Sequence, residues 1–229
     1  MPNWLYQYFQ DIIKPMLVTK DGRKLEKPAA YKDYGPHSPP SFWIHPPEPV
    51  FDLSQHRFNP ISLYRPRVYL WLPHHLVDNM RCPKCGRDKL EKQGALPPWR
   101  IFDLEDVFYL VAWAYYCRHG CRSYFKGWSQ ALLESLPQYI RLSFPAILSY
   151  KSGLSHRVMT HLRVGNQHWM GPRGVRSLLY EMHTVRFNIL QLQYIECIVQ
   201  NVIMKRACAK IYWVRICVWY QVQCMSMER

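Results

Sequence analysis

The pattern of apolar and polar positions first predicts β-strands in the middle of the chain. In VFYLVAWAYY, every second position from 107 to 115 is apolar or aromatic and would share one face of a strand, because strand side chains alternate between faces. WRIFDL, at 99–104, predicts a partner strand, with the acidic pair Glu105-Asp106 as the turn between them. A shorter apolar run at 68–72 predicts a third strand that ends before Pro73.

Helical spacing takes over after the second cysteine pair. SQALLESL predicts a short helix that Pro137 ends, and SHRVMTHLR predicts a second helix that is capped at Ser155 and ended by a glycine. A longer helix is predicted from Pro172 onward, because proline is favoured in a first helical turn and apolar residues recur on one face through position 189. No glycine or proline follows Gly174, so continuous helix is expected through 191–229, with a strand as the alternative for IYWVRICVWY.

Proline divides the chain of 229 residues into parts. Residues 1–60 carry ten of the eighteen prolines and predict an irregular or disordered leader with one short helix near 6–13. Residues 61–190 are expected to form the folded domain, and 191–229 a helical or aberrant tail. The predicted class is α+β, in which a small β-hairpin unit is followed by a helical segment.

A strong positive charge lies in the same middle part. Thirty Lys and Arg against sixteen Asp and Glu give a formal net charge of +14, and eighteen basic against eight acidic residues within 61–190 account for +10 of it. With 48% hydrophobic and 15% aromatic residues, the chain is too apolar for a basic disordered tail. Charges interrupt the apolar stretches well short of the roughly 20 residues that span a bilayer, and the N-terminus lacks a secretory signal. We therefore expect an intracellular protein, in the nucleus or cytoplasm, without membrane contact.

Cysteine spacing indicates a metal site. Cys82, Cys85, Cys117 and Cys121 form two close pairs, whereas the other four of the eight cysteines are scattered from position 197 onward. In a reducing compartment, close pairs favour metal binding over disulfides. The 31 residues between Cys85 and Cys117 suffice for a hairpin that returns the second pair to the first. Four thiolates suit tetrahedral Zn²⁺, so we expect structural zinc in a zinc-ribbon-like hairpin.

Alternatives remain within this motif. The second pair has CxxxC spacing, where two intervening residues are more usual, and His119 inside it could replace Cys121 as the fourth ligand. Catalytic zinc is not expected, because four protein ligands leave no position for water. A redox CxxC lacks the βαβ context typical of it. Four ordinary buried thiols are the remaining alternative.

Basic and aromatic residues are interleaved around the cysteines and predict contact with nucleic acid. Lys and Arg neutralise phosphates and release counterions, and exposed rings stack on bases. For any single residue, a solvated basic face with the aromatics in the core is the alternative. A second basic stretch, 151–186, predicts two Arg-bearing helices whose connection is longer than that of a helix-turn-helix. The predicted contacts are Arg81, Lys84, Arg87, Lys89, Arg100, Arg118, Arg122 and Lys126 in the first stretch and Arg157, Arg163, Arg173 and Arg176 in the second.

No catalytic arrangement is predicted. Asp103, Glu105 and Asp106 fall together around the predicted turn, and turn formation explains them without two-metal chemistry. The spacing of the histidines gives neither a metal pair nor a Ser-His-Asp arrangement.

The order of the motifs resembles a known family. RVYLWLPHHL, CPKCG, YYCRHGC, FKGWSQALLESLP, FPAILSYKSGLSHRVMTHLR and GPRGVRSLLYEMH, within about 65–200, are similar to an uncharacterised, mainly basidiomycete fungal family, domain of unknown function 6729. The resemblance places the family's paired cysteines on Cys82, Cys85, Cys117 and Cys121. It implies an association with mobile-element or nuclease-like proteins, and no established activity. The tail after about Cys197 departs from the pattern, as a truncated gene or a read-through would.

Together these observations predict a zinc-stabilised nucleic-acid-binding module that is derived from a mobile element and has no catalysis of its own. DNA or RNA would be its partner. The alternatives are a protein-interaction adaptor and a truncated fragment of a nuclease-like or transposase-like protein.

Overall fold

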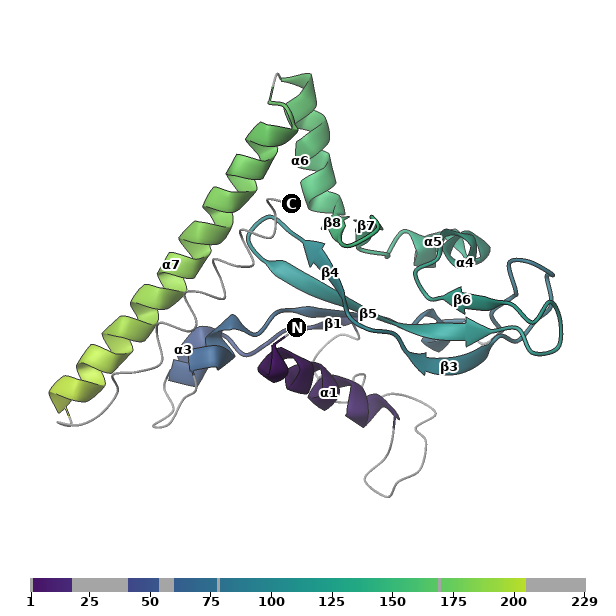
Figure 1. Cartoon of the computed structure of the whole chain (residues 1–229), viewed down its shortest axis with the longest axis horizontal. Coiled ribbons are helices and arrows are strands. Elements are labelled where there is room, and N and C mark those ends of the chain that lie inside the picture. The colour runs from purple at the N-terminus through teal and green to yellow at the C-terminus, as the bar shows by residue number, and fades with distance from the viewer. Residues whose placement is uncertain (1, 18–40, 54–59, 78, 169, 205–229) are drawn as a thin grey trace. The chain divides into compact units, whose positions relative to one another are not determined.

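The computed structural model describes residues 2–17, 41–53, 60–77, 79–168 and 170–204 (Figure 1). Contacts group the chain into two compact units, which we call the sheet unit and the helical unit. The sheet unit comprises Met1–His45, Pro66–Phe102 and Val107–His156, and the helical unit comprises Pro46–Arg65, Asp103–Asp106 and Arg157–Arg229. These boundaries do not follow the predicted divisions at 60 and 190.

Strand β5, Val107–Tyr116, runs through the middle of the sheet unit. Its first half pairs antiparallel with β4, Trp99–Phe102, on one side and parallel with β2, Val68–Trp71, on the other. All three strands were predicted, and they are confirmed. Residues 108–112 are all buried, so this half of β5 is covered on both faces. The alternating pattern predicts only one buried face, because it overlooks the apolar residues at the even positions.

The sheet extends on both sides of these three strands. Its order is β1-β2-β5-β4-β8-β7, with β8 parallel to β4 and antiparallel to β7. A Cβ on Gly153 would lie 2.6 Å from Ile101 Cδ1 and 2.9 Å from the carbonyl oxygen of Ile147, so this close pairing requires glycine. The added strands are β1, Trp43–Ile44, β7, Ala146–Leu148, and β8, Gly153–Ser155.

The second half of β5 belongs to a three-stranded arrangement. β3, Glu91–Ala95, and β6, Tyr124–Lys126, pair antiparallel with residues 113–116 and 114–116 respectively. The register of β3 shifts before Gly94, whose φ of +140° is a conformation that glycine adopts without strain. The paired cysteines lie at the ends of these three strands.

The α+β class is confirmed, but a small hairpin followed by helices does not describe the observed order. Two short helices, α4, Gln130–Ser135, and α5, Gln138–Arg141, follow the cysteine region, and α4 confirms the helix predicted before Pro137. The chain then returns to the sheet as β7 and β8. Each of these strands has three residues, which are too few for alternation to reveal them.

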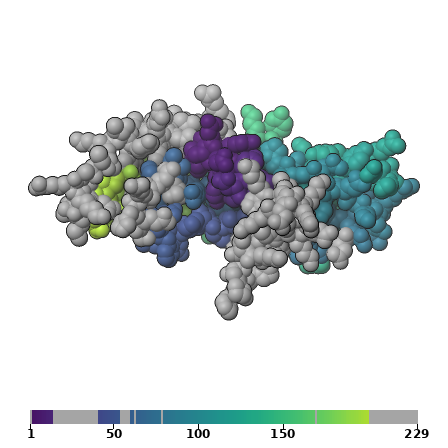
Figure 2. Space-filling model, turned by 90° about the horizontal axis from the view of Figure 1, so that it is seen from below, coloured from purple at the N-terminus to yellow at the C-terminus, as the bar shows by residue number. Residues whose placement is uncertain are grey.

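Helix α1, Asn3–Leu17, makes the start of the chain a regular part of the fold. It buries Leu5, Phe9 and Ile13, which recur every four residues on one face. Phe9 packs edge-on against Tyr109 of β5, with ring centroids 4.9 Å apart. Figure 2 shows the outer side of α1, in purple, at the molecular surface. The helix predicted near 6–13 is thus confirmed and is longer than expected, and β1 places a further part of the predicted irregular leader in the sheet.

Aromatic side chains fill the core of the sheet unit. Trp71 and Tyr115 are fully buried, and Trp71 packs edge-on against Phe144 with ring centroids 5.1 Å apart. The indole N–H of Trp71 donates to the carbonyl oxygen of Gly127 at 2.9 Å. This bond satisfies a buried donor and ties the end of β2 to the segment that follows β6.

The helical unit is dominated by α7, Pro172–Met204. It begins at the predicted proline and passes position 190 without a break, because no glycine or proline follows Gly174 in its first turn, so the predicted boundary at 190 falls inside a helix. The predicted tail beyond it, 205–229, lies outside the described residues. Among the helices of the described residues, none combines the length and apolarity needed to span a bilayer. The helical unit also contains α3, Pro49–Leu53, a 3-10 turn at Pro60–Tyr64, and all of α6, His156–Gln167, except its first residue. A second 3-10 turn, Pro73–His75, belongs to the sheet unit.

Candidate metal centre

The first cysteine pair lies in a tight turn before β3. The N–H of Gly86 donates to the carbonyl oxygen of Cys82 at 2.9 Å, and the N–H of Cys82 donates to the carbonyl oxygen of Arg87 at 2.8 Å. Gly86 has φ of +70°, the left-handed conformation that glycine accepts at little cost. The CPKCG sequence therefore folds back on itself and turns Cys82 and Cys85 toward the same side.

The second pair lies between β5 and β6. Cys117 directly follows β5, and its N–H donates to the carbonyl oxygen of Ser123 at 3.0 Å, which closes a loop that contains Cys121. Arg122 has a positive φ of 49° in this loop. The extra residue of the CxxxC spacing is accommodated here, so the unusual spacing does not keep the two sulfur atoms apart.

The four sulfur atoms converge on one point. The Sγ atoms of Cys82 and Cys121 are 3.5 Å apart, those of Cys85 and Cys117 are 3.6 Å apart, and all four lie within 4.8 Å of one another. A disulfide would need about 2.05 Å, so these are free thiols in contact. Within the part of the chain that the structure describes, this is the group of close ligand side chains that could hold a metal ion.

The surroundings of the four thiols give them different pKa values. Burial raises the pKa of Cys82 and raises that of Cys117 to about 11. Backbone N–H groups, chiefly that of Arg87, lower the pKa of Cys85 to about 6, and a hydrogen bond from the Ser123 side chain lowers that of Cys121. Cys85 and Cys121 therefore lose their protons more readily than a free cysteine, and Cys82 and Cys117 less readily. A cation at the centre would favour the thiolate form of all four.

His119, the predicted alternative ligand, is exposed and is not a member of this group. Its carbonyl oxygen accepts a hydrogen bond from the guanidinium of Arg87, which links the two turns. Cys121 supplies the fourth sulfur, so the geometry favours the all-cysteine set over the alternative with histidine.

The predicted nucleic-acid contacts in the sheet unit divide into those held by a neighbouring side chain and those that pair with no acidic side chain, and all of them except Arg100, on β4, lie on the turns and strands next to the cysteines. Arg81 pairs with Asp88 at 2.9 Å, and Arg118 with Glu91 at 3.5 Å, both at exposed positions. Arg100 lies over the ring of Phe102, 4.9 Å from its centroid. The exposed side chains that pair with no acidic side chain of the described residues are Lys84, Arg87, Lys89, Arg122 and Lys126.

The other predicted contacts belong to the helical unit. Arg157 lies 4.0 Å from Asp103, whose side chain is 5% exposed, while Arg163, Arg173 and Arg176 are exposed on α6 and α7. These four residues belong to the helical unit, whereas the cysteines belong to the sheet unit. The predicted turn at 103–106 is confirmed by the bond from the N–H of Asp103 to the carbonyl oxygen of Asp106. Its carboxylates pair with arginines, as Arg186 shows at 3.8 Å from Glu105 and 3.6 Å from Asp106.

The sequence did not indicate the role of Gly120 or the partner of His74, for which only a structural or surface role was expected. A Cβ on Gly120 would lie 2.6 Å from Cys85 Sγ and 2.9 Å from Cys117 Sγ, so a side chain there would press on the sulfur atoms. His74 Nδ1 forms a 2.7 Å hydrogen bond with the hydroxyl of Tyr115, two residues before Cys117. The glycine between the second cysteines was a visible signal, whereas the partner of His74 depends on the parallel pairing of β2 with β5.

The fold and the centre together define an α+β protein with four cysteines that could hold a metal ion. Residues 35–218 match the model of the family described as Domain of unknown function (DUF6729), and the chain belongs to that family. The family resemblance inferred from the motifs is thereby confirmed. No match was found among curated proteins or among solved structures.

Proposed function

We propose that the cysteine centre binds one structural Zn²⁺ ion. A tetrahedron with zinc–sulfur bonds of about 2.3 Å has sulfur–sulfur edges of about 3.8 Å. The contacts of 3.5 Å and 3.6 Å across the centre are close to that edge and support the proposal. Zinc would neutralise the thiolates and cross-link two turns that have little apolar surface of their own, as in a zinc-ribbon-like element.

The zinc-bound sheet unit serves to bind DNA or RNA in this proposal, without catalysis of its own. The observation that carries it is the unbalanced charge beside the centre: Cys117 to Lys126 contains three basic residues and no acidic one. Lys84, Arg87 and Lys89 add exposed cations on the first turn. Such side chains exchange condensed counterions for phosphate contacts. Four sulfur ligands leave no open coordination position, which favours a structural over a catalytic ion.

Metal content and nucleic-acid binding are measured on the same preparations to test this function. The wild-type chain is expected to contain one zinc per chain by elemental analysis and to bind DNA or RNA with an affinity that falls steeply with salt. Cys82→Ser and Cys117→Ser are expected to lose both properties. Cys197→Ser is the matched control, because Cys197 donates to the carbonyl oxygen of Leu53 and lies outside the centre. Iron in place of zinc, or binding that ignores salt, would contradict the proposal.

A protein-interaction adaptor is the second candidate function. The observation that favours it is a row of exposed apolar side chains on α7, including Val185, Ile189 and Leu192, which are 47%, 51% and 66% exposed. Large exposed apolar patches are rare on soluble monomers and often mark sites of protein–protein interaction. A protein partner recovered by the full chain after nuclease treatment, and lost on Ile189→Glu, would support this candidate.

The location and origin of the protein remain part of the proposal. Reduced cysteine pairs suit the nucleus or cytoplasm, where thiols are kept free for metals. A mobile-element origin, or a fragment of a nuclease-like protein, is supported only by the family resemblance.

A further inference from the structure

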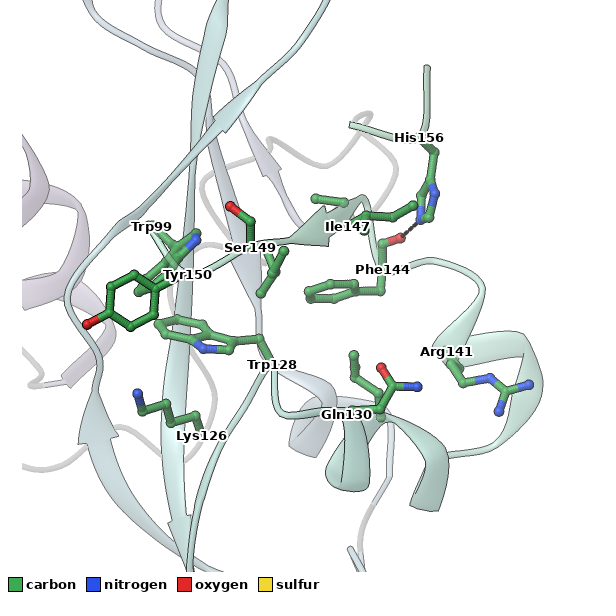
Figure 3. A pocket seen from close by; sticks show the side chains of 13 residues that line it. Trp99, Lys126, Trp128, Gln130, Arg141, Phe144, Ile147, Ser149, Tyr150 and His156 are labelled. Carbon is green, nitrogen blue, oxygen red and sulfur yellow. Dashed lines mark hydrogen bonds between the residues drawn. The ribbon is translucent and has the colours of Figure 1, made fainter. Parts of the chain in front are cut away.

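A cavity of about 620 Å³ opens within the sheet unit, away from the metal ligands (Figure 3). Its walls come from β4, from β6 and α4 and the segment between them, from α5, from the hairpin of β7 and β8, and from the first residue of α6. This volume is in the range of sites that hold a small ligand, roughly 300–1,000 Å³. The cavity is therefore large enough to receive one nucleotide.

Aromatic rings form one side of the cavity. The rings of Trp99 and Trp128 are 5.5 Å apart at their centroids and tilted by 48°. Tyr150, in the turn between β7 and β8, is 90% exposed, and Figure 3 shows its ring on the same side of the cavity as that of Trp128. A large ring held so far in solvent gains little from the fold, because only buried apolar surface contributes to stability. It is available as a stacking platform.

Two cations line the cavity, and none of its lining residues is acidic. Lys126 and Arg141 are both exposed, and no acidic side chain of the described residues pairs with either. Figure 3 shows them at separate ends of the cavity. This spacing suits a chain of phosphates that passes across the cavity better than a single compact anion.

We propose that this cavity binds an unpaired nucleotide of a single-stranded nucleic acid. Its base would stack on Trp128 and Tyr150, and the adjoining phosphates would contact Lys126 and Arg141. A base inside a duplex has both faces covered by its neighbours, whereas an unpaired base offers a free face to an aromatic ring. The inference rests on the proposed nucleic-acid function and adds the strand state and the residues that recognise it.

Fluorescence anisotropy tests this with the full-length, metal-loaded chain. The probes are labelled ten-nucleotide oligo-dT and oligo-U, and a blunt ten-base-pair duplex for comparison. The single strands are expected to bind more tightly than the duplex. Tyr150→Ala and Trp128→Ala should each weaken single-strand binding by about 5- to 150-fold, the range for loss of one base stack. Tyr139→Ala is the matched control, because Tyr139 is 70% exposed on α5 and does not line the cavity. The single-strand affinity of this variant should stay within about twofold of the wild-type value.

Salt dependence separates the two kinds of contact. Lys126→Gln and Arg141→Gln should each lower the slope of log affinity against log salt by about 0.7, the value for one phosphate contact on a single strand. The aromatic variants should weaken binding at every salt concentration and leave the slope unchanged, because they remove no charge. Zinc content, measured on each variant, reports whether the sheet unit is intact.

Tyr150→Ala is the decisive variant, because a side chain so exposed is not needed for folding. Unchanged single-strand affinity in this variant, or a preference for the duplex, would overturn the pocket while the proposed nucleic-acid function stands. Absence of binding to all three probes at low salt would overturn both. Binding lost in Tyr150→Ala with zinc retained would support both.

Discussion

The α-carbon of Gly120 faces the sulfur atom of Cys85 so closely that a Cβ there would lie 2.6 Å away from it. The same Cβ would lie 2.9 Å from Cys117 Sγ. The glycine that makes the CxxxC spacing unusual thus allows the two cysteine turns to approach each other. Space beside the sulfur atoms, more than a positive φ, is what requires glycine at this position.

Gly120→Ala is therefore expected to weaken metal retention. The added methyl group must displace one of the two sulfur atoms, and such overpacking costs typically about 1–3 kcal/mol. We expect faster zinc release to a chromogenic chelator than in the wild type, with the metal still bound at saturation. Gly171→Ala is the matched control, since no atom lies within 4 Å of a Cβ there. Equal release rates in the two variants would count against this role of Gly120.

His74 gives the sheet unit a predicted pH dependence. Burial, together with the nearby charges of His75 and Lys92, lowers the pKa of His74 to about 3, against about 6.5 in an unfolded chain. Between these two values the unfolded chain binds one more proton than the folded chain. The free energy of unfolding should therefore fall as the pH is lowered, by up to about 1.4 kcal/mol per pH unit from this group.

Urea denaturation of the wild type and of His74→Gln between pH 7 and pH 5 measures this dependence. The variant has no imidazole to protonate, so its free energy of unfolding should change less with pH. Acid would also release a metal ion bound at the cysteines, but that contribution would be common to both proteins and cancel in the difference between their slopes. Parallel slopes would show that the folded and the unfolded chain bind the same number of protons at His74 in this pH range.

The sequence predicted the cluster of four cysteines better than its surroundings. Close cysteine pairs are recognisable because metal geometry limits their spacing, and the long apolar alternation of β5 and the proline at the start of α7 are equally local signals. The strands β7 and β8 and the cavity they help to form depend on pairing between residues about fifty positions apart, such as Ile101 with Gly153. No local pattern encodes that pairing. In the sequence, Trp128 is one of the aromatic residues interleaved with basic residues near the second cysteine pair, whereas nothing singles out Tyr150.

Phe9 is expected to be the residue that holds α1 on the sheet. It is 1% exposed and packs edge-on against Tyr109. Phe9→Ala should lower the free energy of unfolding by about 3–5 kcal/mol, the usual cost of removing a buried phenyl ring. Tyr6→Ala, on the exposed side of the same helix at 55% exposure, should cost less than about 0.5 kcal/mol. Denaturation monitored by circular dichroism compares the two, and similar losses would show that α1 contributes little through this face.

In the helical unit, His183 and Arg186 of α7 both contact the segment 103–106. We expect His183 to contribute more to the free energy of unfolding than Arg186. His183 is 4% exposed, and its Nε2 donates to the carbonyl oxygen of Asp103 at 2.9 Å. His183→Ala leaves that buried acceptor unpaired, which costs about 1–3 kcal/mol before the loss of packing is counted. The Arg186 side chain is 44% exposed in its ion pairs, so Arg186→Ala should cost less than about 1 kcal/mol.

Urea denaturation at neutral pH, at low salt and at 0.5 M salt, ranks the two variants. Raised salt should reduce only the loss caused by Arg186→Ala, because screening acts on exposed charges and leaves a buried hydrogen bond intact. A larger loss for Arg186→Ala than for His183→Ala would reverse this ranking and assign the attachment of the segment to its carboxylates.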